Sequence, residues 1–213
     1  MSIPFFNPEN SFWRGFTRVM DLVGLTMCWI ICSLPVVTIC ASTTALYDAI
    51  YHGVRLGEQG DYVRFLRTFR RELKTGILIT LPAIGVALLY VLLFFMSYSM
   101  AAAGDKVAGV AVYAYQCIFC IPLAIWLFAC CMLSRFDFKP MQLLATAAKL
   151  VFAHLPSALV LTVMVVLLAK VAISWPISIF CMPGLAAFFA SYLMERIFKP
   201  FLPKEEDEEE FME

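Results

Sequence analysis

The chain has 213 residues, of which 62% are hydrophobic and only 15% are charged, and its formal net charge is zero. Domains that fold in water are closer to half apolar and a quarter charged, so this composition excludes an ordinary water-soluble domain. Without a net positive charge there is no general basic field for nucleic acid, and the chain is predicted to bind none. The apolar excess requires lipid, and runs of about 20 apolar residues predict an all-α membrane protein.

The first hydrophobic region, residues 12–56, is interrupted at Ser33-Leu34-Pro35. Pro35 lacks a backbone donor and disfavours helical geometry at the residue before it, so a helix is expected to end there. Two interpretations are open. Either a single helix of about 20–41 crosses the membrane, or helices 12–33 and 40–56 form a short hairpin.

The basic residues favour the hairpin with both termini in the cytoplasm, because Lys and Arg concentrate on the cytoplasmic side of membrane proteins. The hairpin places 14 of the 16 basic residues inside, namely Arg14, Arg18, Arg55, Arg64, Arg67, Arg70, Arg71, Lys74, Arg135, Lys139, Lys149, Arg196, Lys199 and Lys204. The single span moves Arg14 and Arg18 outside and leaves 12 inside. The sequence therefore predicts five to six transmembrane helices and favours six.

The hairpin would place two acids, Asp21 and Asp48, in the cytoplasmic half of adjacent helices. Acids inside a membrane are unfavourable, so each is a candidate functional residue that is expected to be paired or neutral. The candidate intramembrane polar cluster comprises Arg18, Asp21, Ser42, Thr43, Thr44 and Asp48. We favour a structural role, with Asp21 paired to Arg18 and Asp48 bonded to backbone or tyrosine hydroxyls, over a proton or substrate relay.

Residues 61–74, DYVRFLRTFRRELK, have apolar side chains at helical spacing and basic side chains on the other faces. This pattern is typical of a helix that lies on the cytoplasmic membrane interface. Its basic face is a candidate surface for binding lipid or a partner and consists of Arg64, Arg67, Arg70, Arg71 and Lys74.

The later part of the chain contains further hydrophobic runs that are long enough to cross a bilayer. They are residues 76–101, 107–133, 156–173 and 177–197, with turns at Gly104-Asp105-Lys106 and Ser174-Trp175-Pro176. Residues 139–154 form a second, less charged amphipathic segment, with Pro140 suited to a first helical turn. Pro183-Gly184 is expected to kink the last helix.

Each amphipathic segment precedes a transmembrane hairpin, so the order of segments in 61–133 recurs in 139–197 and indicates a degenerate internal repeat. Residues 1–204 are predicted to form one transmembrane helical domain. Residues 205–213 hold seven acids in nine positions and are expected to form a disordered tail.

The sequence shows no catalytic, cofactor or metal motif. Cys117-Ile-Phe-Cys120 matches C-x-x-C, but no second pair or His cluster accompanies it, so the eight cysteines are interpreted as small apolar residues. His52 and His154 stand near the cytoplasmic ends of helices and are expected to cap or solvate them. The chain is therefore predicted not to be an enzyme and to need no cofactor.

The N-terminal motifs carry a family resemblance. They are Phe12-x-x-x-Phe16-x-Arg18-x-x-Asp21-Leu22, Ser33-Leu34-Pro35-Val36-Val37-Thr38-Ile39, Ala41-Ser42-Thr43-Thr44-Ala45-Leu46-Tyr47 and Phe65-x-x-x-Phe69-Arg70-Arg71-x-x-Lys74. Together these resemble the YesL family, bacterial membrane proteins of unknown function, over roughly residues 12–75. Family members typically have Gly at the position of Cys40.

The resemblance implies a multi-pass protein of the bacterial cytoplasmic (inner) membrane, whose genes often lie near carbohydrate-uptake transporters. We therefore expect an accessory component of carbohydrate uptake or utilisation, in contact with the bilayer and with a transporter subunit. A stand-alone small-solute transporter and a membrane-embedded sensor or scaffold are the alternatives. The later spans, 76–101 and 156–173, show few polar groups that could line a transport path.

Overall fold

The described part of the computed structural model comprises residues 11–57, 60–103, 106–136 and 138–198. These residues form seven α-helices and no strand, which confirms the all-α prediction. The α-helices are α1 (Ser11–Ser33), α2 (Ile39–Ala49), α3 (Asp61–Ala102), α4 (Lys106–Leu133), α5 (Pro140–Ala153), α6 (Leu155–Ser174) and α7 (Met182–Phe198). The predicted acidic tail, 205–213, lies outside the described residues, as do Gly104 and Asp105 of the first predicted turn.

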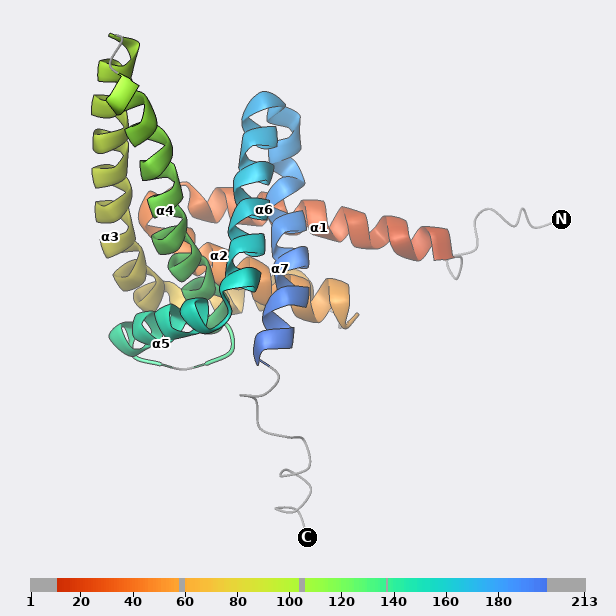
Figure 1. The fold of residues 1–213 in the computed structure, drawn as a ribbon. Coiled ribbons are helices and arrows are strands. Elements are labelled where there is room, and N and C mark those ends of the chain that lie inside the picture. The colour runs from red at the N-terminus through yellow and green to blue at the C-terminus, as the bar shows by residue number, and fades with distance from the viewer. Residues whose placement is uncertain (1–10, 58–59, 104–105, 137, 199–213) are drawn as a thin grey trace, which may run out of the picture.

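The chain reverses at the predicted proline break. After α1 ends at Ser33, a bend leads into the 3-10 helix η2 (Val36–Thr38) and then into α2. The Thr38 hydroxyl stabilises this turn by donating to the carbonyl oxygens of Cys32 and Pro35, each at 2.7 Å. The second arm continues from α2 into the π-helix η3 (Ile50–Arg55). Figure 1 shows α1 running crosswise to the long hairpins α3–α4 and α6–α7.

The predicted amphipathic helix 61–74 and the predicted span 76–101 are parts of one continuous helix, α3. Its 42 residues extend about 63 Å, well beyond a hydrocarbon core of about 30 Å. Gly76 lies inside the helix, where its lack of a side chain allows α3 to pack closely against α2. A Cβ atom at Gly76 would lie 2.8 Å from the Cβ atom and 2.9 Å from the backbone nitrogen of Ala41 in α2.

The C-terminal half has a separate short helix, α5, before its hairpin α6–α7, whereas the amphipathic segment of the first half is part of α3. In Figure 1, α5 lies across the lower end of the α3–α4 hairpin, and α6 and α7 stand beside α3 and α4. Between α6 and α7 lies the 3-10 helix η4 (Pro176–Phe180). Pro183 and Gly184 fall in the first turn of α7, so the expected kink within the last helix was wrong, and they mark its start instead.

Three helical stretches of the described chain are long and apolar enough to cross a membrane: Asp61–Ala102, Gly109–Leu133 and Leu155–Ser174. Only 11% of the most apolar window of α3 is buried within the protein, so most of its Leu, Val and Phe side chains need an apolar solvent. The structure thus supports a membrane protein. Helix α7, with 17 residues, is shorter than these three.

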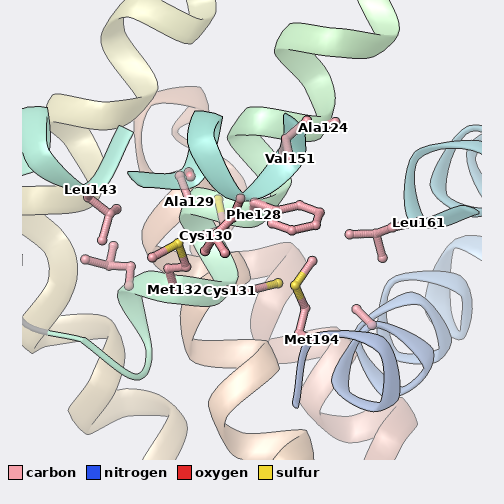
Figure 2. Close-up of a cluster of buried hydrophobic side chains, with 14 of the residues drawn as sticks. Ala124, Phe128, Ala129, Cys130, Cys131, Met132, Leu143, Val151, Leu161 and Met194 are labelled. Carbon is pink, nitrogen blue, oxygen red and sulfur yellow. The ribbon is translucent and has the colours of Figure 1, made fainter. Parts of the chain in front are cut away.

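The main core lies where the C-terminal end of α4 meets its neighbours. Phe128, Cys130 and Met132 of α4 are at most 2% exposed. Figure 2 shows these side chains gathered with Leu143 and Val151 of α5, Leu161 of α6 and Met194 of α7. This core holds α5 and the ends of both hairpins together, and it positions the polar residues described next.

Candidate functional site

A network of polar and charged side chains lies at the end of the bundle beside this core. Asp48 on α2 is 7% exposed, and the Thr68 hydroxyl of α3 donates to its Oδ2 atom at 2.7 Å. His52 follows one turn later, with its Nε2 atom 3.6 Å from Oδ1 of Asp48. A buried carboxylate needs such partners, because without them burial would strongly disfavour its charged form.

Arg135, just beyond α4, is the centre of the network. Its Nε and Nη2 atoms donate to Oε1 of Glu195 on α7, at 3.0 and 2.7 Å. The Tyr47 hydroxyl donates to the same oxygen at 3.2 Å. The guanidinium also lies 3.8 Å from the centroid of the Tyr51 ring, a favourable cation–π distance. With side-chain exposures of 15% and 11%, Arg135 and Glu195 form a largely buried ion pair.

His52 joins the two parts of the network. Its Nε2 atom lies 3.3 Å from Nη1 of Arg135 and 3.6 Å from the Asp48 carboxylate. An arginine only donates, so Nε2 can accept from Arg135 only when it carries no proton, whereas a protonated Nε2 can donate to Asp48. In the structure, Nε2 of His52 is placed to accept from Arg135 at 3.3 Å, and its 3.6 Å separation from Asp48 is a close electrostatic contact.

The π-helix η3 sets the position of several of these side chains. Its six residues include Tyr51, His52 and Arg55. Arg55 donates from Nη1 to the Ser191 carbonyl oxygen at 2.9 Å, and its guanidinium lies 4.3 Å from the Tyr192 ring centroid. Extra-wide turns of this kind occur often at functional sites, and here one aims three polar side chains at α7 and at the end of α4.

The network connects segments that are far apart in the sequence, because it joins α2 and η3 to α3, to α7 and to Arg135 in the turn after α4. It is suited to holding these elements in register. Within the described residues, no group of three or more His, Cys, Asp or Glu side chains could hold a metal ion.

The candidate polar cluster inferred from sequence is divided in the structure, and only Asp48 lies in the network. Ser42 bonds Ser33 at 2.6 Å between hydroxyls, Thr43 accepts from the Trp29 indole at 3.2 Å, and Thr44 donates to the Cys130 carbonyl at 2.9 Å. These residues therefore hold α2 against α1 and α4.

The other two members of that cluster lie on α1. Arg18 is exposed and Asp21 is half-buried. No ion pair joins their side chains in the described part of the chain. The expected Arg18–Asp21 pair is therefore not formed here, because the Arg18 side chain stands on the open side of α1.

The basic face lies on the first turns of α3. Arg67, Arg70, Arg71 and Lys74 are exposed and Arg64 is half-buried. The Arg71 guanidinium pairs with Glu72, which is only 5% exposed. The remainder of this face presents positive charge at the same end of the molecule as α5.

Sequence reasoning missed Arg135 and Glu195. Arg135 stood out only as a charge in a predicted cytoplasmic loop. Glu195 is the one acid in the hydrophobic segment 177–197, so the criterion that singled out Asp48 would have found it. His52 was expected only to cap or solvate a helix end.

The fold and this network define a class, an all-helical membrane protein with a buried polar network at one end of its bundle. Residues 22–96 match a family model described as "Protein of unknown function, DUF624", the family of YesL-like membrane proteins. The match supports the resemblance seen in the N-terminal motifs and spans the second half of α1, all of α2 and most of α3. It includes Asp48, His52 and Thr68 but not Arg135 or Glu195. No curated protein and no solved structure matches the chain.

Proposed function

We propose that the protein is a non-enzymatic accessory component of a carbohydrate-uptake system, which docks on a transporter subunit in the bacterial cytoplasmic membrane. The observation that carries this proposal is the closure of the buried network on itself. Arg135, Glu195 and Asp48 are satisfied by Tyr47, His52 and Thr68, so the charged groups are engaged within the protein. Such a network suits a rigid protein that docks on a partner better than it suits a binding site for a polar solute.

The membrane-spanning region also favours an accessory role over transport by this chain alone. A transporter needs polar groups along a path near the middle of the membrane. The hydroxyls of Thr80 and Thr162, on α3 and α6, instead bond the carbonyl oxygens of Gly76 and Ala158 in their own helices. No polar path is therefore evident between the described spans.

The proposed topology has both termini in the cytoplasm and the long hairpins α3–α4 and α6–α7 across the membrane, with α1 running crosswise to them (Figure 1). The basic first turns of α3, Arg135 and the C-terminal end of α7 gather at one end of the long hairpins, where α5 lies (Figure 1). The turns at the other end hold few basic residues, so the positive-inside rule supports this end as the cytoplasmic one.

The basic face of α3 is the proposed docking surface. Arg67, Arg70 and Lys74 are exposed at the cytoplasmic end and could attract an acidic partner surface or anionic lipid, with about 1 kcal/mol per basic residue near a charged membrane. The link to carbohydrate uptake is supported by the family resemblance.

A membrane-embedded sensor is the second candidate. The observation that favours it is His52, whose Nε2 atom faces both the Asp48 carboxylate and the Arg135 guanidinium.

Affinity purification in mild detergent, from the native host grown on different polysaccharides, tests the proposal. We expect a transporter subunit to copurify with the unaltered protein, and less of it with a variant carrying Arg67→Glu, Arg70→Glu and Lys74→Glu. The matched control replaces the same three residues with Gln. Solute uptake by the purified protein alone in proteoliposomes would contradict the accessory role and support a transporter.

A further inference from the structure

One amide side chain of the membrane-spanning region stands on an open helix face. Gln116 belongs to α4 and lies within Gly109–Leu133, a stretch long and apolar enough to cross a membrane. Its side chain is exposed, and the side-chain amide has no hydrogen-bond partner in the described part of the chain. Any partner for this amide therefore comes from another molecule.

The position of Gln116 along α4 places it in the hydrocarbon layer. Helix α4 has 28 residues, Lys106–Leu133, and extends about 42 Å at about 1.5 Å per residue. Gln116 lies about 15 Å from the first residue of this helix and about 26 Å from the last. Because both distances are shorter than a hydrocarbon core of about 30 Å, the core contains Gln116 wherever it falls within the helix. Water does not reach this depth, so an amide without a partner is strongly unfavourable there.

The residues around Gln116 form a stripe that suits close helix packing. Gly109, Tyr113, Gln116 and Cys120 follow each other at spacings of four, three and four positions, which places them on one side of α4. Tyr113 is 72% exposed, and a Cβ atom at Gly109 would meet nothing within 4 Å. Membrane helices associate along such stripes, because small residues let two backbones approach and polar side chains bond between the helices.

A second copy of the chain is the partner that this stripe fits. A primary amide carries both a donor and an acceptor, so it is complementary to another copy of itself. Copies inserted with the same topology hold Gln116 at the same depth, and a twofold axis along the membrane normal brings the two amides face to face. The second copy thus supplies the missing partner at the required depth without any further component.

We propose that the protein forms a parallel homodimer in the membrane, in which the α4 helices of two copies pack along the stripe Gly109, Tyr113, Gln116 and Cys120. The side-chain N–H group of each Gln116 donates to the side-chain carbonyl oxygen of the other, so two reciprocal hydrogen bonds form. The alternating spacing of four and three positions is that of left-handed helix pairs, which cross at about 20°. The interface lies on a different helix from the basic face of α3 and is independent of docking on a transporter subunit.

The test measures dimerisation in liposomes. Full-length copies with a donor or an acceptor fluorescent protein at the C-terminus are reconstituted together over a series of protein-to-lipid ratios, and energy transfer gives the dissociation constant. We expect energy transfer that saturates as a dimer. Gln116→Leu should raise the dissociation constant about tenfold, the factor that an interhelical hydrogen bond confers in membranes. Its melting temperature should not fall, because the exposed amide bonds nothing in the described part of the chain.

Two further variants serve as controls. Gln116→Asn keeps a self-complementary amide and should dimerise more tightly than Gln116→Leu. Gln142→Leu makes the same exchange at an exposed position of α5, away from the α4 stripe, and should leave the dissociation constant unchanged.

Cross-linking gives a second measurement that does not alter Gln116. Cys120 is exposed one turn after Gln116 on the same stripe, and its thiol donates to the Gln116 backbone carbonyl oxygen at 3.4 Å. In a chain with Cys117→Ala, which removes the neighbouring exposed thiol, oxidation by copper phenanthroline should yield a disulfide-linked dimer on a denaturing gel. Adding Cys120→Ala should abolish this dimer, whereas adding Cys181→Ala, at a half-buried position before α7, should not.

Several results would overturn the proposal. They are a monomer at every protein-to-lipid ratio, a dissociation constant that Gln116→Leu leaves unchanged, a dimer that Gln142→Leu weakens equally, or a cross-linked dimer that survives Cys120→Ala. A monomer that loses a copurified transporter subunit on Gln116→Leu would also overturn it, and would assign the stripe to that subunit.

Discussion

Arg135 and Glu195 stand 60 positions apart in the sequence, yet two nitrogen atoms of the guanidinium donate to one oxygen of the carboxylate, at 3.0 and 2.7 Å. This pair connects the turn after α4 to the last turns of α7. The core between the hairpins is built from apolar side chains such as Phe128 and Met194, whose contacts are not directional. The ion pair therefore fixes how the hairpins are aligned at this end of the bundle.

Breaking this pair should strongly destabilise the protein. Glu195→Gln leaves the Arg135 charge largely buried without its counter-ion, and removal of one partner of a buried pair typically lowers the free energy of unfolding by about 3–5 kcal/mol. We expect a clear drop in melting temperature in detergent. The double variant Arg135→Met with Glu195→Leu should recover much of this loss, since it leaves no unpaired charge. Additive losses in the double variant would show that the two residues do not interact.

The bond between Thr68 and Asp48 distinguishes a structural acid from a functional one. Thr68→Val removes a donor to a buried carboxylate, and we expect a loss of about 1–3 kcal/mol in unfolding free energy. Thr146→Val on α5 is the matched control, because its hydroxyl bonds only the Gln142 carbonyl of its own helix near the surface. Denaturation in detergent measures both.

Asp48→Asn completes that comparison. If Asp48 is structural, the amide keeps one acceptor for Thr68, and any cellular phenotype should fall only in proportion to the loss of folded protein. If yield and melting temperature stay normal while the phenotype disappears, Asp48 takes part in a functional site.

The contact between α2 and α3 should depend on Gly76. Gly76→Leu places a side chain against Ala41, where even a Cβ atom would lie 2.9 Å from backbone nitrogen, and overpacking of this kind costs about 1–3 kcal/mol. Gly85 lies further along the same helix, and a Cβ atom there would meet nothing within 4 Å, so Gly85→Ala should instead stabilise α3 by about 0.5–1 kcal/mol. If Gly76→Leu and Gly85→Ala changed the unfolding temperature by the same amount, close packing of α2 against α3 would be contradicted.

The topology predicts opposite accessibility for two single cysteines in a background without native cysteines. Ala103→Cys, just after α3, should react with an impermeant thiol reagent outside cells whose outer membrane is permeable to it. Ser2→Cys should react only after the inner membrane is opened, because both termini are expected in the cytoplasm. External labelling of Ser2→Cys would favour the single-span interpretation of residues 12–56.

The hydrophobic runs by themselves determined the helices, since each run of apolar residues can satisfy its backbone only as a helix in lipid. The break at Pro35 was predictable for the same local reason, because proline cannot continue the hydrogen bonds of α1. The continuity of α3 through Gly76 was not predictable. A glycine can either end a helix or allow two helices to approach closely, and the position of Ala41 in α2 decides between these roles.

The network of Asp48, His52, Arg135 and Glu195 was decided only by the tertiary structure. Each residue is visible in the sequence as a charge or a titratable group near the end of an apolar segment, but its partner depends on which helix ends meet and at what rotation. Those are set by the packing of Phe128, Met194 and their neighbours in the core (Figure 2). Apolar periodicity specifies which face of a helix is buried. The pairing of Arg135 with Glu195 also requires two helix ends to be packed so that donor and acceptor atoms come within about 3 Å of each other.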